Sequence, residues 1–250
     1  MPKAIAYDFE VISKQEITPT VFQLGLKPNQ PLDFLAGQFI STIIPGAGPG
    51  GRNLRRAYSI ASGSNRHRGH NHLELCIKIV ANGKGSSYLY SLKVGDVFKG
   101  AAPYGDFVYA TPPEKLAYFI ATGTGIAPFR SMLQDGLTQK ANLLFGASWQ
   151  NELLYDSEFK IFAQSLPQFQ WIPCVSREKN WPGFKGRVTD FLRSNDSHIP
   201  FSHADFYLCG NGGMIAEVKE ILLSKGVDKS NIHFEIYYQP SDFSRETKKS

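Results

Sequence analysis

A change of pattern at Thr111-Pro112-Pro113 divides the sequence into two stretches with different folding preferences. Before it, short apolar runs are separated by glycine, proline and asparagine turns, which is typical of antiparallel β structure. After it, apolar runs alternate with segments of helical period, which is typical of a parallel sheet with crossover helices. The 250 residues suffice for two domains with separate cores. We therefore predict one domain over residues 1–110 and a second over 111–250.

The pattern predicts a small antiparallel β-barrel followed by a doubly wound α/β sheet. Strands of the first domain are expected over residues 5–12, 21–26, 38–44, 56–60, 72–79 and 96–99. Strands of the second are expected over residues 116–121, 142–146, 170–175, 206–209 and 232–237. Helices are expected to begin near Ala127, Asp156, Val188 and Gly213, and a short one is expected after Gly83.

Composition excludes several functional classes. Hydrophobic residues make up 42% of the chain and charged residues 20%, which argues against intrinsic disorder. The longest apolar runs are strand-sized, far below the ~20 residues of a membrane-spanning helix. Cys76, Cys174 and Cys209 are widely spaced, so neither a disulfide framework nor a metal or iron–sulfur site is expected. Residues 1–10 lack a signal-peptide pattern, so we expect a reducing compartment, the cytoplasm.

The chain carries a formal net charge of +5. Its basic residues are most concentrated between positions 52 and 70, at Arg52, Arg55, Arg56, Arg66 and Arg68. A mild excess of this kind suits an acidic partner or a phosphate and does not indicate a nucleic-acid-binding protein. The nearby His67, His70 and His72 have no matching cysteine or carboxylate cluster, and we interpret their segment as a solvated loop.

The sharpest local signal is the loop Gly123-Thr124-Gly125, which follows the predicted strand 116–121 and precedes Pro128. Two glycines let the backbone turn tightly and approach a pyrophosphate. Proline suits the first turn of a helix, and the helix N-terminus then faces the anion. The alternative is an ordinary βα turn.

Three later segments end predicted strands of the second domain. Ser176-Arg177 follows one strand, and Arg187 comes ten residues later, where an arginine can accept the 2′-phosphate that separates NADP from NAD. Solvated surface arginines are the alternative. Cys209-Gly210 places a thiol where a cofactor would react, although a core cysteine is the commoner case. Glu235 is a carboxylate inside an apolar run, which is unexpected unless it pairs or takes part in chemistry.

Three segments of the first domain could hold another ligand. On the strand Arg56-Ala57-Tyr58-Ser59, alternation places the arginine and the tyrosine on one face, so a cation and an aromatic ring can serve one ligand. Another strand ends in Cys76-Ile77-Lys78, whose cysteine is alternatively a small buried hydrophobe. The turn Gly85-Ser86-Ser87 offers N–H groups and hydroxyls to a second pyrophosphate, or is alternatively a hairpin loop.

Together, in this order and with this spacing, these segments resemble the ferredoxin–NADP⁺ reductase family over about residues 5–238. The resemblance implies an FAD site that comprises Arg56, Ala57, Tyr58, Ser59, Cys76, Ile77, Lys78, Gly85, Ser86 and Ser87. It implies an NADP(H) site that comprises Gly123, Thr124, Gly125, Pro128, Ser176, Arg177, Arg187, Cys209 and Gly210. Catalytic roles are implied for Ser59, Cys209 and Glu235. Tyr237, with Tyr238 as the alternative, is implied to cover the flavin.

The function that the resemblance implies is hydride transfer between NADP(H) and FAD, with single-electron exchange to a separate acidic carrier, ferredoxin or flavodoxin. A separate carrier is expected because the chain has neither clustered cysteines nor length for an FMN domain. The alternatives are a flavin reductase or the reductase component of an oxygenase. A non-catalytic nucleotide-binding module is the third, and the joint presence of Ser59, Cys209 and Glu235 argues against it. The sequence leaves the oligomeric state open, a monomer included.

Overall fold

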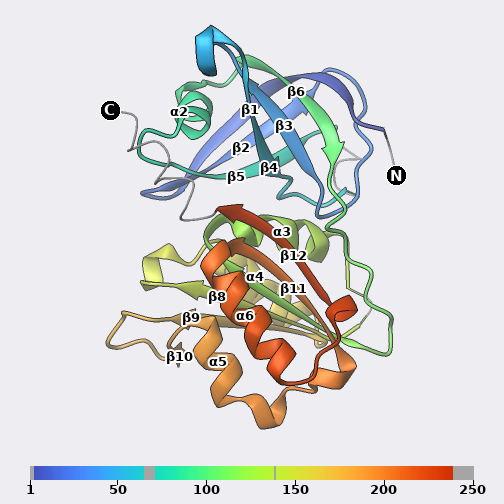
Figure 1. Cartoon of the computed structure of the whole chain (residues 1–250). Helices are drawn as coiled ribbons and strands as arrows, with labels where there is room; N and C mark the ends of the chain where they lie inside the picture. The colour runs from blue at the N-terminus through green and yellow to red at the C-terminus, as the bar shows by residue number, and fades with distance from the viewer. Residues whose placement is uncertain (1–2, 65–70, 138, 239–250) are drawn as a thin grey trace. The chain divides into compact units, whose positions relative to one another are not determined.

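The computed structural model describes residues 3–64, 71–137 and 139–238 (Figure 1). The chain divides into two compact units. Unit 1 combines Met1–Tyr109 with Ala127–Gly136, and unit 2 combines Ala110–Ile126 with Leu137–Ser250. The helix α3 (Ala127–Gln134) therefore belongs to unit 1, although the chain before Ala127 and after Gly136 belongs to unit 2.

Unit 1 is built on six antiparallel strands in the order β4-β3-β6-β1-β2-β5. They are β1 (Ile5–Thr18), β2 (Val21–Pro28), β3 (Phe39–Ile44), β4 (Leu54–Ser59), β5 (Leu73–Lys78) and β6 (Val97–Tyr104). The edge strands meet at an isolated bridge between Ile60 and Leu75, which closes the sheet into a barrel. Its interior is apolar, with Phe9, Leu24 and Phe98 fully or almost fully buried. This confirms the predicted antiparallel barrel.

Several strands of the barrel run beyond their predicted ends, and β1 and β6 extend furthest. The strand β1 continues to Thr18 because two register shifts, between Val11 and Ser13 and between Glu16 and Thr18, keep it paired with β2. Most of this extension is exposed or half-buried, so it lacks the apolar alternation that marks a strand. The strand β6 continues to Tyr104 because its second half pairs with β3, and the last pair joins Tyr104 to Phe39.

Unit 1 also contains the short helix predicted after Gly83. It is α2 (Lys84–Ser91), and a 3-10 helix, η1 (Pro49–Gly51), lies in the loop between β3 and β4. The glycine before α2 has extended backbone angles, and the amide of Ser87 donates to its carbonyl at 2.9 Å. The first turn of α2 is thus closed by backbone hydrogen bonds.

Unit 2 is built on a parallel sheet in the order β10-β9-β8-β7-β11-β12. Its strands are β7 (Leu116–Thr122), β8 (Ala141–Ala147), β9 (Phe169–Val175), β10 (Phe184–Lys185), β11 (Ala204–Asn211) and β12 (Ile232–Tyr238). From β7, the next three strands in the chain are added on one side as β8, β9 and β10. The last two, β11 and β12, are added on the other side of β7. The order therefore reverses between β7 and β11, which confirms the predicted doubly wound sheet.

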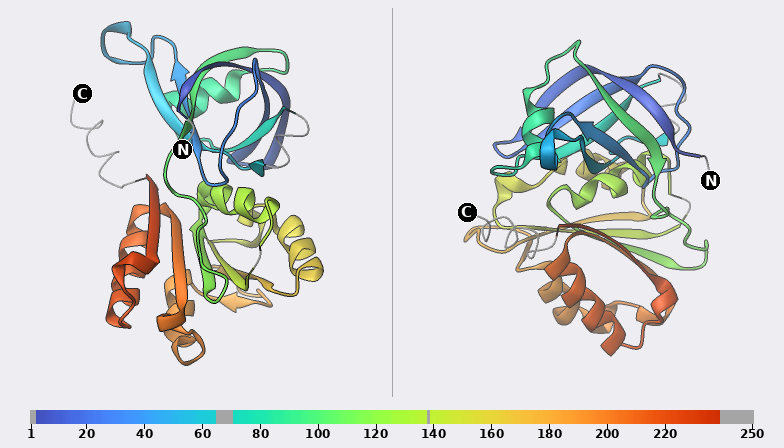
Figure 2. Two further views of the ribbon diagram at one scale, coloured as in Figure 1. Left: turned by 90° about the vertical axis from the view of Figure 1, so that its right-hand side faces the viewer. Right: turned by 45° about the horizontal axis from the view of Figure 1, so that its top comes forward.

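Helices cover both faces of this sheet (Figure 2). One face carries α4 (Asp156–Ser165), and the other carries α5 (Val188–Ser194) and α6 (Gly212–Ser224). The connections also contain the 3-10 helices η2 (Gly123–Ile126), η3 (Gln150–Glu152), η4 (Asp196–His198), η5 (Phe201–His203) and η6 (Lys229–Asn231). The helix α6 buries Ile215, Val218 and Leu222, a spacing of three and four residues that lays one apolar stripe on the sheet.

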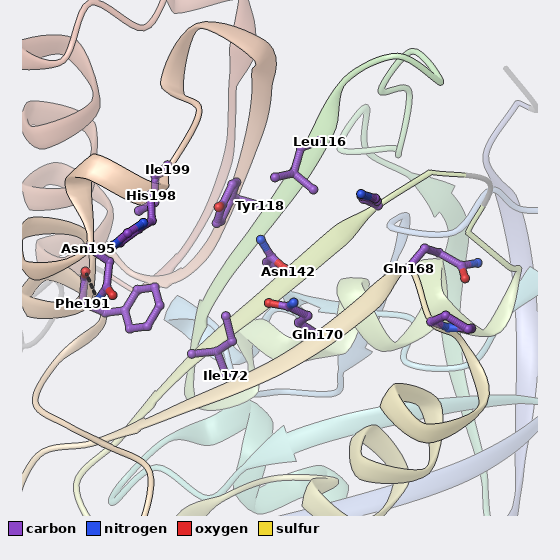
Figure 3. Close-up of a pocket in the computed structure, with 12 residues that line it drawn as sticks. Leu116, Tyr118, Asn142, Gln168, Gln170, Ile172, Phe191, Asn195, His198 and Ile199 are labelled. Carbon is purple, nitrogen blue, oxygen red and sulfur yellow. Dashed lines mark hydrogen bonds between the residues drawn. The ribbon is translucent and has the colours of Figure 1, made fainter.

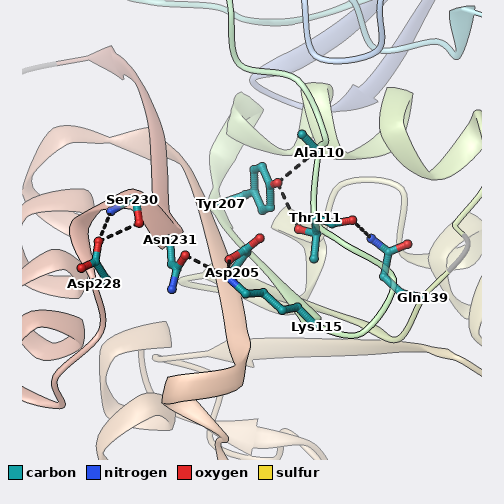
Figure 4. A network of polar contacts seen from close by, with 9 residues as sticks. All are labelled: Ala110, Thr111, Lys115, Gln139, Asp205, Tyr207, Asp228, Ser230 and Asn231. Carbon is teal, nitrogen blue, oxygen red and sulfur yellow. Dashed lines mark hydrogen bonds and ion pairs between the residues drawn. The ribbon is translucent and has the colours of Figure 1, made fainter.

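Polar contacts anchor the segment that enters β7 (Figure 4). The Thr111 hydroxyl donates to the Tyr207 hydroxyl at 3.0 Å. The Lys115 ammonium donates to Asp205 at 3.0 Å and to the side-chain oxygen of Asn231 at 2.9 Å. Because Asp205 is only 4% exposed, its pairing with Lys115 satisfies a charge that would be costly to bury alone. These bonds hold the amino-terminal ends of β7 and β11 together.

Candidate functional site

The strand β4 and the start of α2 converge on one surface of unit 1. A Cβ atom added to Gly85 would lie 2.9 Å from the Arg56 Cγ atom and 2.8 Å from the Tyr58 hydroxyl oxygen. Both distances are shorter than a real Cβ contact, so a larger residue at position 85 would require the Arg56 and Tyr58 side chains to shift. The structure thus brings together Arg56, Tyr58 and Gly85, which were predicted as flavin-binding residues from separate segments.

The charge and the phenol on this surface have different environments. Arg56 and Ala57 are exposed, whereas Tyr58 is half-buried and Ser59, the last residue of the strand, is only 4% exposed. Burial raises the pKa of Tyr58 to about 12, although the Arg56 charge lowers it. The phenol therefore stays neutral at physiological pH and keeps a hydrogen to donate. An exposed guanidinium beside a half-buried ring fits the phosphate and the flat ring system of FAD.

The serines of the Gly85-Ser86-Ser87 turn differ in their contacts. The Ser86 hydroxyl donates to the Gly83 carbonyl at 3.1 Å and accepts from the Val80 amide at 3.1 Å. This buried hydroxyl holds the turn closed. The side chain of Ser87 is exposed. Ser87 is therefore the residue of the turn that is exposed and could meet a phosphate.

The predicted segment on β5 is divided by the alternation of the strand. Ile77 is 1% exposed and belongs to the barrel core with Leu73 and Leu75. Cys76 is also buried but lies on the opposite face, while Lys78 is exposed at the end of the strand. A flavin beside this strand would meet the cysteine and the lysine, and Ile77 would support them from within the barrel.

The glycine loop of unit 2 lies where the strand order reverses. A Cβ atom added to Gly125 would clash with the Cys209 carbonyl and lie 2.6 Å from the Gly210 Cα atom. Gly210 has φ +134, and a Cβ there would lie 2.6 Å from the Thr122 carbonyl oxygen. The carboxyl ends of β7 and β11 therefore approach each other closely through glycines. Ligands of doubly wound sheets bind at this position.

Cys209 and Glu235 lie side by side on the neighbouring strands β11 and β12. They are register partners in the pairing of β11 with β12, and Cys209 is fully buried. Burial raises the pKa of the Cys209 thiol well above its usual range, and the Glu235 charge raises it further. A hydrogen bond from Tyr237 and the Gly210 backbone act in the opposite direction. The raised pKa keeps the thiol protonated at neutral pH, which disfavours a role as nucleophile.

The structure gathers the three residues predicted to meet a 2′-phosphate, here called the arginine rim: Ser176, Arg177 and Arg187. Ser176 directly follows the last residue of β9, Val175. The carbonyl of Val175 accepts from the Gly186 amide at 3.0 Å, which places Arg187 beside it. Both arginine side chains are exposed at the carboxyl edge of the sheet. Two cations at this edge suit a phosphate monoester.

Trp149 lies next to the arginine rim and was not predicted. The Arg177 amide donates to the carbonyl of Ser148 at 2.9 Å, so the turn after β8 is tied to the rim. The Glu152 carboxylate accepts from the amides of Ser148 and Trp149 and fixes that turn. The indole is 43% exposed. A tryptophan soon after the end of a predicted strand was the signal available in the sequence.

A separate cavity of about 380 Å³ lies at the other end of the unit 2 strands (Figure 3). Residues near the starts of three strands line it, among them Tyr118, Asn142 and Gln170. Figure 3 shows Phe191 and His198 on its opposite side. None of the predicted site residues lines this cavity, because those of unit 2 follow the carboxyl ends of the strands.

Other expectations concern metals, membranes and the basic stretch. Over the described ranges, no group of three or more histidine, cysteine or acidic side chains is arranged to hold a metal ion. In the same ranges, no helix has the length and apolar character needed to cross a membrane. Arg52, Arg55 and Arg56 are exposed. The remaining members of the basic stretch, with His67 and His70, lie outside the described residues, as do the residues after Tyr238.

Comparison with known proteins agrees with this arrangement. The oxidoreductase FAD-binding domain model matches residues 8–109, and the oxidoreductase NAD-binding domain model matches residues 119–220. Ferredoxin–NADP reductase B of Sorangium cellulosum (strain So ce56) is 30% identical over 251 residues, which cover 95% of this chain and 100% of the relative. The reductase component of phenol 2-monooxygenase from Pseudomonas sp. (strain CF600) is 29% identical over 243 residues, which cover 94% of this chain and 66% of the relative.

A solved structure shows the same fold. The ferredoxin NADP⁺ reductase from Neisseria gonorrhoeae, determined with bound FAD and NADP, superimposes with a TM-score of 0.79 at 22% identity, covering 95% of this chain and 100% of the other. The two domain models define an oxidoreductase that binds FAD and a nicotinamide nucleotide. The chain belongs to the ferredoxin–NADP⁺ reductase family.

Proposed function

We propose that this protein is a ferredoxin(flavodoxin)–NADP⁺ reductase, which exchanges hydride between NADP(H) and FAD and single electrons with a separate carrier protein. The observation that carries the proposal is the meeting of Gly125, Cys209 and Glu235 at the reversal point of the unit 2 sheet, with the arginine rim at the same edge. FAD is proposed from the convergence of Arg56, Tyr58 and Gly85 in unit 1. The three buried free cysteines suit a reducing compartment, and we propose the cytoplasm.

The environment of each site residue is compatible with the role proposed for it. Bound FAD would supply the two-electron and one-electron chemistry that amino-acid side chains lack. Arg56 would pair with the FAD pyrophosphate, and the Tyr58 ring would pack on the flavin. The Gly123-Thr124-Gly125 backbone would admit the nucleotide pyrophosphate. Cys209 and Glu235 would line the nicotinamide pocket. Cys209 would contribute a small neutral thiol, and Glu235 would contribute a carboxylate.

Anaerobic mixing of the purified protein with NADPH tests the proposal directly. We expect a yellow protein that retains FAD, whose flavin absorbance bleaches on mixing with NADPH in a stopped-flow instrument. Subsequent addition of oxidised ferredoxin or flavodoxin should restore the absorbance. Failure of both NADPH and NADH to bleach retained FAD would refute the proposed reductase. A colourless protein that turns over only with added flavin would instead support a flavin reductase.

A reductase component of an oxygenase is the second candidate. The relative from phenol 2-monooxygenase favours it, since it matches almost the whole of this chain at 29% identity. This chain spans about two thirds of that relative. Coupling assays distinguish the two candidates, because a ferredoxin(flavodoxin) reductase passes electrons through a free carrier. Exposed Arg52 and Arg55 suit an acidic carrier, so coupled cytochrome c reduction should slow as ionic strength rises.

Reversing one charge of the arginine rim tests the coenzyme preference. Arg177→Glu should raise the Michaelis constant for NADPH at least tenfold while leaving that for NADH almost unchanged, because only NADPH carries the 2′-phosphate. Steady-state kinetics with both coenzymes measure the effect. Lys179→Glu makes the same charge change two residues away and should alter both constants little. Equal effects of Arg177→Glu on the two coenzymes would remove Arg177 from the phosphate site.

Removing the exposed indole tests recognition of the adenine. We expect Trp149→Ala to raise the Michaelis constants for NADPH and NADH alike, by about tenfold, because stacking on a base contributes on the order of 1–3 kcal/mol and both coenzymes carry adenine. Trp149→Phe keeps a flat ring and should recover most of the loss. Affinity for AMP, measured by titration calorimetry, should follow the same order. Unaltered constants in Trp149→Ala would show that the indole contacts no base.

A further inference from the structure

The barrel of unit 1 closes at a seam between its edge strands. Beyond the bridge between Ile60 and Leu75, the Ala61 amide donates to the Glu74 carbonyl at 2.7 Å. The two predicted flavin-binding strands lie on either side of this seam. Ser59 comes two residues before Ala61, and Cys76 comes two residues after Glu74. The width of the seam therefore sets the spacing between the two strands.

One guanidinium binds both sides of the seam. Arg130, on α3, donates from Nη1 to the Ala61 carbonyl at 2.9 Å and to the Glu74 carboxylate at 2.6 Å. It is only 5% exposed, and the side chain of Glu74 is 15% exposed. Glu74 and Cys76 share one face of β5 because they are two residues apart. The arginine thus holds the face of the strand that carries the predicted flavin-contacting cysteine.

Neighbouring residues of α3 hold the rest of the loop that follows β4. The Ser131 hydroxyl donates to the Ser62 carbonyl at 2.6 Å. The Gln134 side chain accepts from the Gly63 amide at 2.8 Å. The next residue of the loop, Ser64, hydrogen-bonds Asp135 just beyond the end of the helix. Consecutive loop residues therefore have partners on or beside one helix.

We infer that Arg130 is a positioning residue for the flavin site, which fixes the distance between the strand that ends at Ser59 and the strand that carries Cys76. The inference rests on the proposed FAD site. A buried ion pair adds little net stability, because desolvation of the two charges offsets most of their attraction. Its geometry is nonetheless specific, because the planar guanidinium presents its donors at fixed angles. The contribution of Arg130 is thus expected in the geometry of the site more than in the stability of the barrel.

A double substitution separates positioning from stability. Arg130→Met alone or Glu74→Leu alone leaves a buried charge without its partner, and either should lower the melting temperature. Arg130→Met combined with Glu74→Leu replaces the ion pair by apolar side chains. This double variant should recover most of the loss in melting temperature. We nevertheless expect this double variant to release FAD about tenfold more readily than the wild type. The visible circular dichroism of its remaining bound flavin should also change.

The matched control is Arg193→Met combined with Glu217→Leu in unit 2. That pair is also hydrogen-bonded, at 2.8 Å, but its side chains are 52% and 37% exposed. FAD affinity and the flavin spectrum should match the wild type there. Fluorescence titration of the full-length apoprotein with FAD gives the dissociation constants.

Three results would be decisive. Wild-type FAD affinity and spectrum in a stable Arg130→Met, Glu74→Leu variant would overturn the inference and leave the reductase proposal standing. If the double variant does not fold, Arg130→Lys decides, because lysine keeps the charge beside Glu74 without the planar fork. Weaker FAD binding in that variant supports the inference, and unchanged binding overturns it. A wild-type protein without affinity for FAD would instead refute the proposed function itself.

Discussion

Gly125→Ala should weaken NADPH binding about 100-fold while the purified protein keeps its full complement of FAD. The added methyl group would meet the Cys209 carbonyl and, at 2.6 Å, the Gly210 Cα atom. Both are backbone atoms, so relief requires a shift of the glycine loop or of the end of β11 and not a side-chain rotation. Overpacking of this kind costs about 1–3 kcal/mol, and a 100-fold loss of affinity corresponds to ~2.7 kcal/mol. Titration with NADP⁺, followed in the flavin spectrum, measures the change.

A second glycine of unit 2 provides the control for this substitution. Gly226 has φ +77, and a Cβ there would meet no described atom within 4 Å. Gly226→Ala therefore imposes backbone strain of about 1–2 kcal/mol without crowding the carboxyl edge of the sheet. It should lower the melting temperature and leave NADP⁺ affinity intact. Equal nucleotide affinities in Gly125→Ala and the wild type would contradict the placement of the pyrophosphate at this loop.

Glu235→Ala should slow reduction of the flavin by NADPH about 100-fold, again with FAD content unaffected. Glu235 is the register neighbour of Cys209 on the adjacent strand, where the nicotinamide is proposed to bind. Positioned ionisable side chains typically contribute factors of 10²–10⁴ to a chemical step. The rate is measured at saturating NADPH in a stopped-flow instrument, so that weaker binding does not enter it.

Two variants separate the charge of Glu235 from its shape. Glu235→Gln keeps the size but removes the charge, and a rate as low as that of Glu235→Ala would assign the effect to the charge. The Glu235 charge raises the pKa of Cys209, so both variants should lower that pKa. Glu220→Ala changes an exposed carboxylate on α6 and should alter neither property. A wild-type rate in Glu235→Ala would remove this residue from the reaction.

Much of the fold can be predicted from local patterns of apolar and polar residues in the sequence. The unit 2 strands are short apolar runs, and predicted helix starts at Ala127, Asp156 and Val188 coincide with α3, α4 and α5. The fourth, Gly213, lies one residue inside α6, because the Asn211 side chain caps the helix by accepting from the Gly213 amide at 2.8 Å. The two-residue strand β10 was not predicted, since so short a run has no period to detect.

The candidate site was harder to predict wherever a residue depends on contacts distant in sequence. Arg56 and Tyr58 could be placed on one face from alternation, but their packing against Gly85 depends on tertiary structure. The contact of Arg130 with Glu74 could not be predicted, because nothing local indicates a partner 56 positions earlier. Trp149 was missed for the same reason. The hydroxyl of Ser86 was assigned to a ligand, yet its observed partners lie within its own turn.

The assignment of α3 to unit 1 has a practical consequence for recombining relatives of this protein. The helix lies in the stretch that matches the NAD-binding domain model, whereas its contacts place it in the unit that contains the barrel. A chimera joined near residue 110 would therefore exchange part of the barrel's support together with the nucleotide-binding region. The barrel of such a hybrid should fold correctly only when the α3 helix of one parent can form the hydrogen bonds to loop 61–64 of the other. Compatible crossovers must carry that loop and α3 from the same parent.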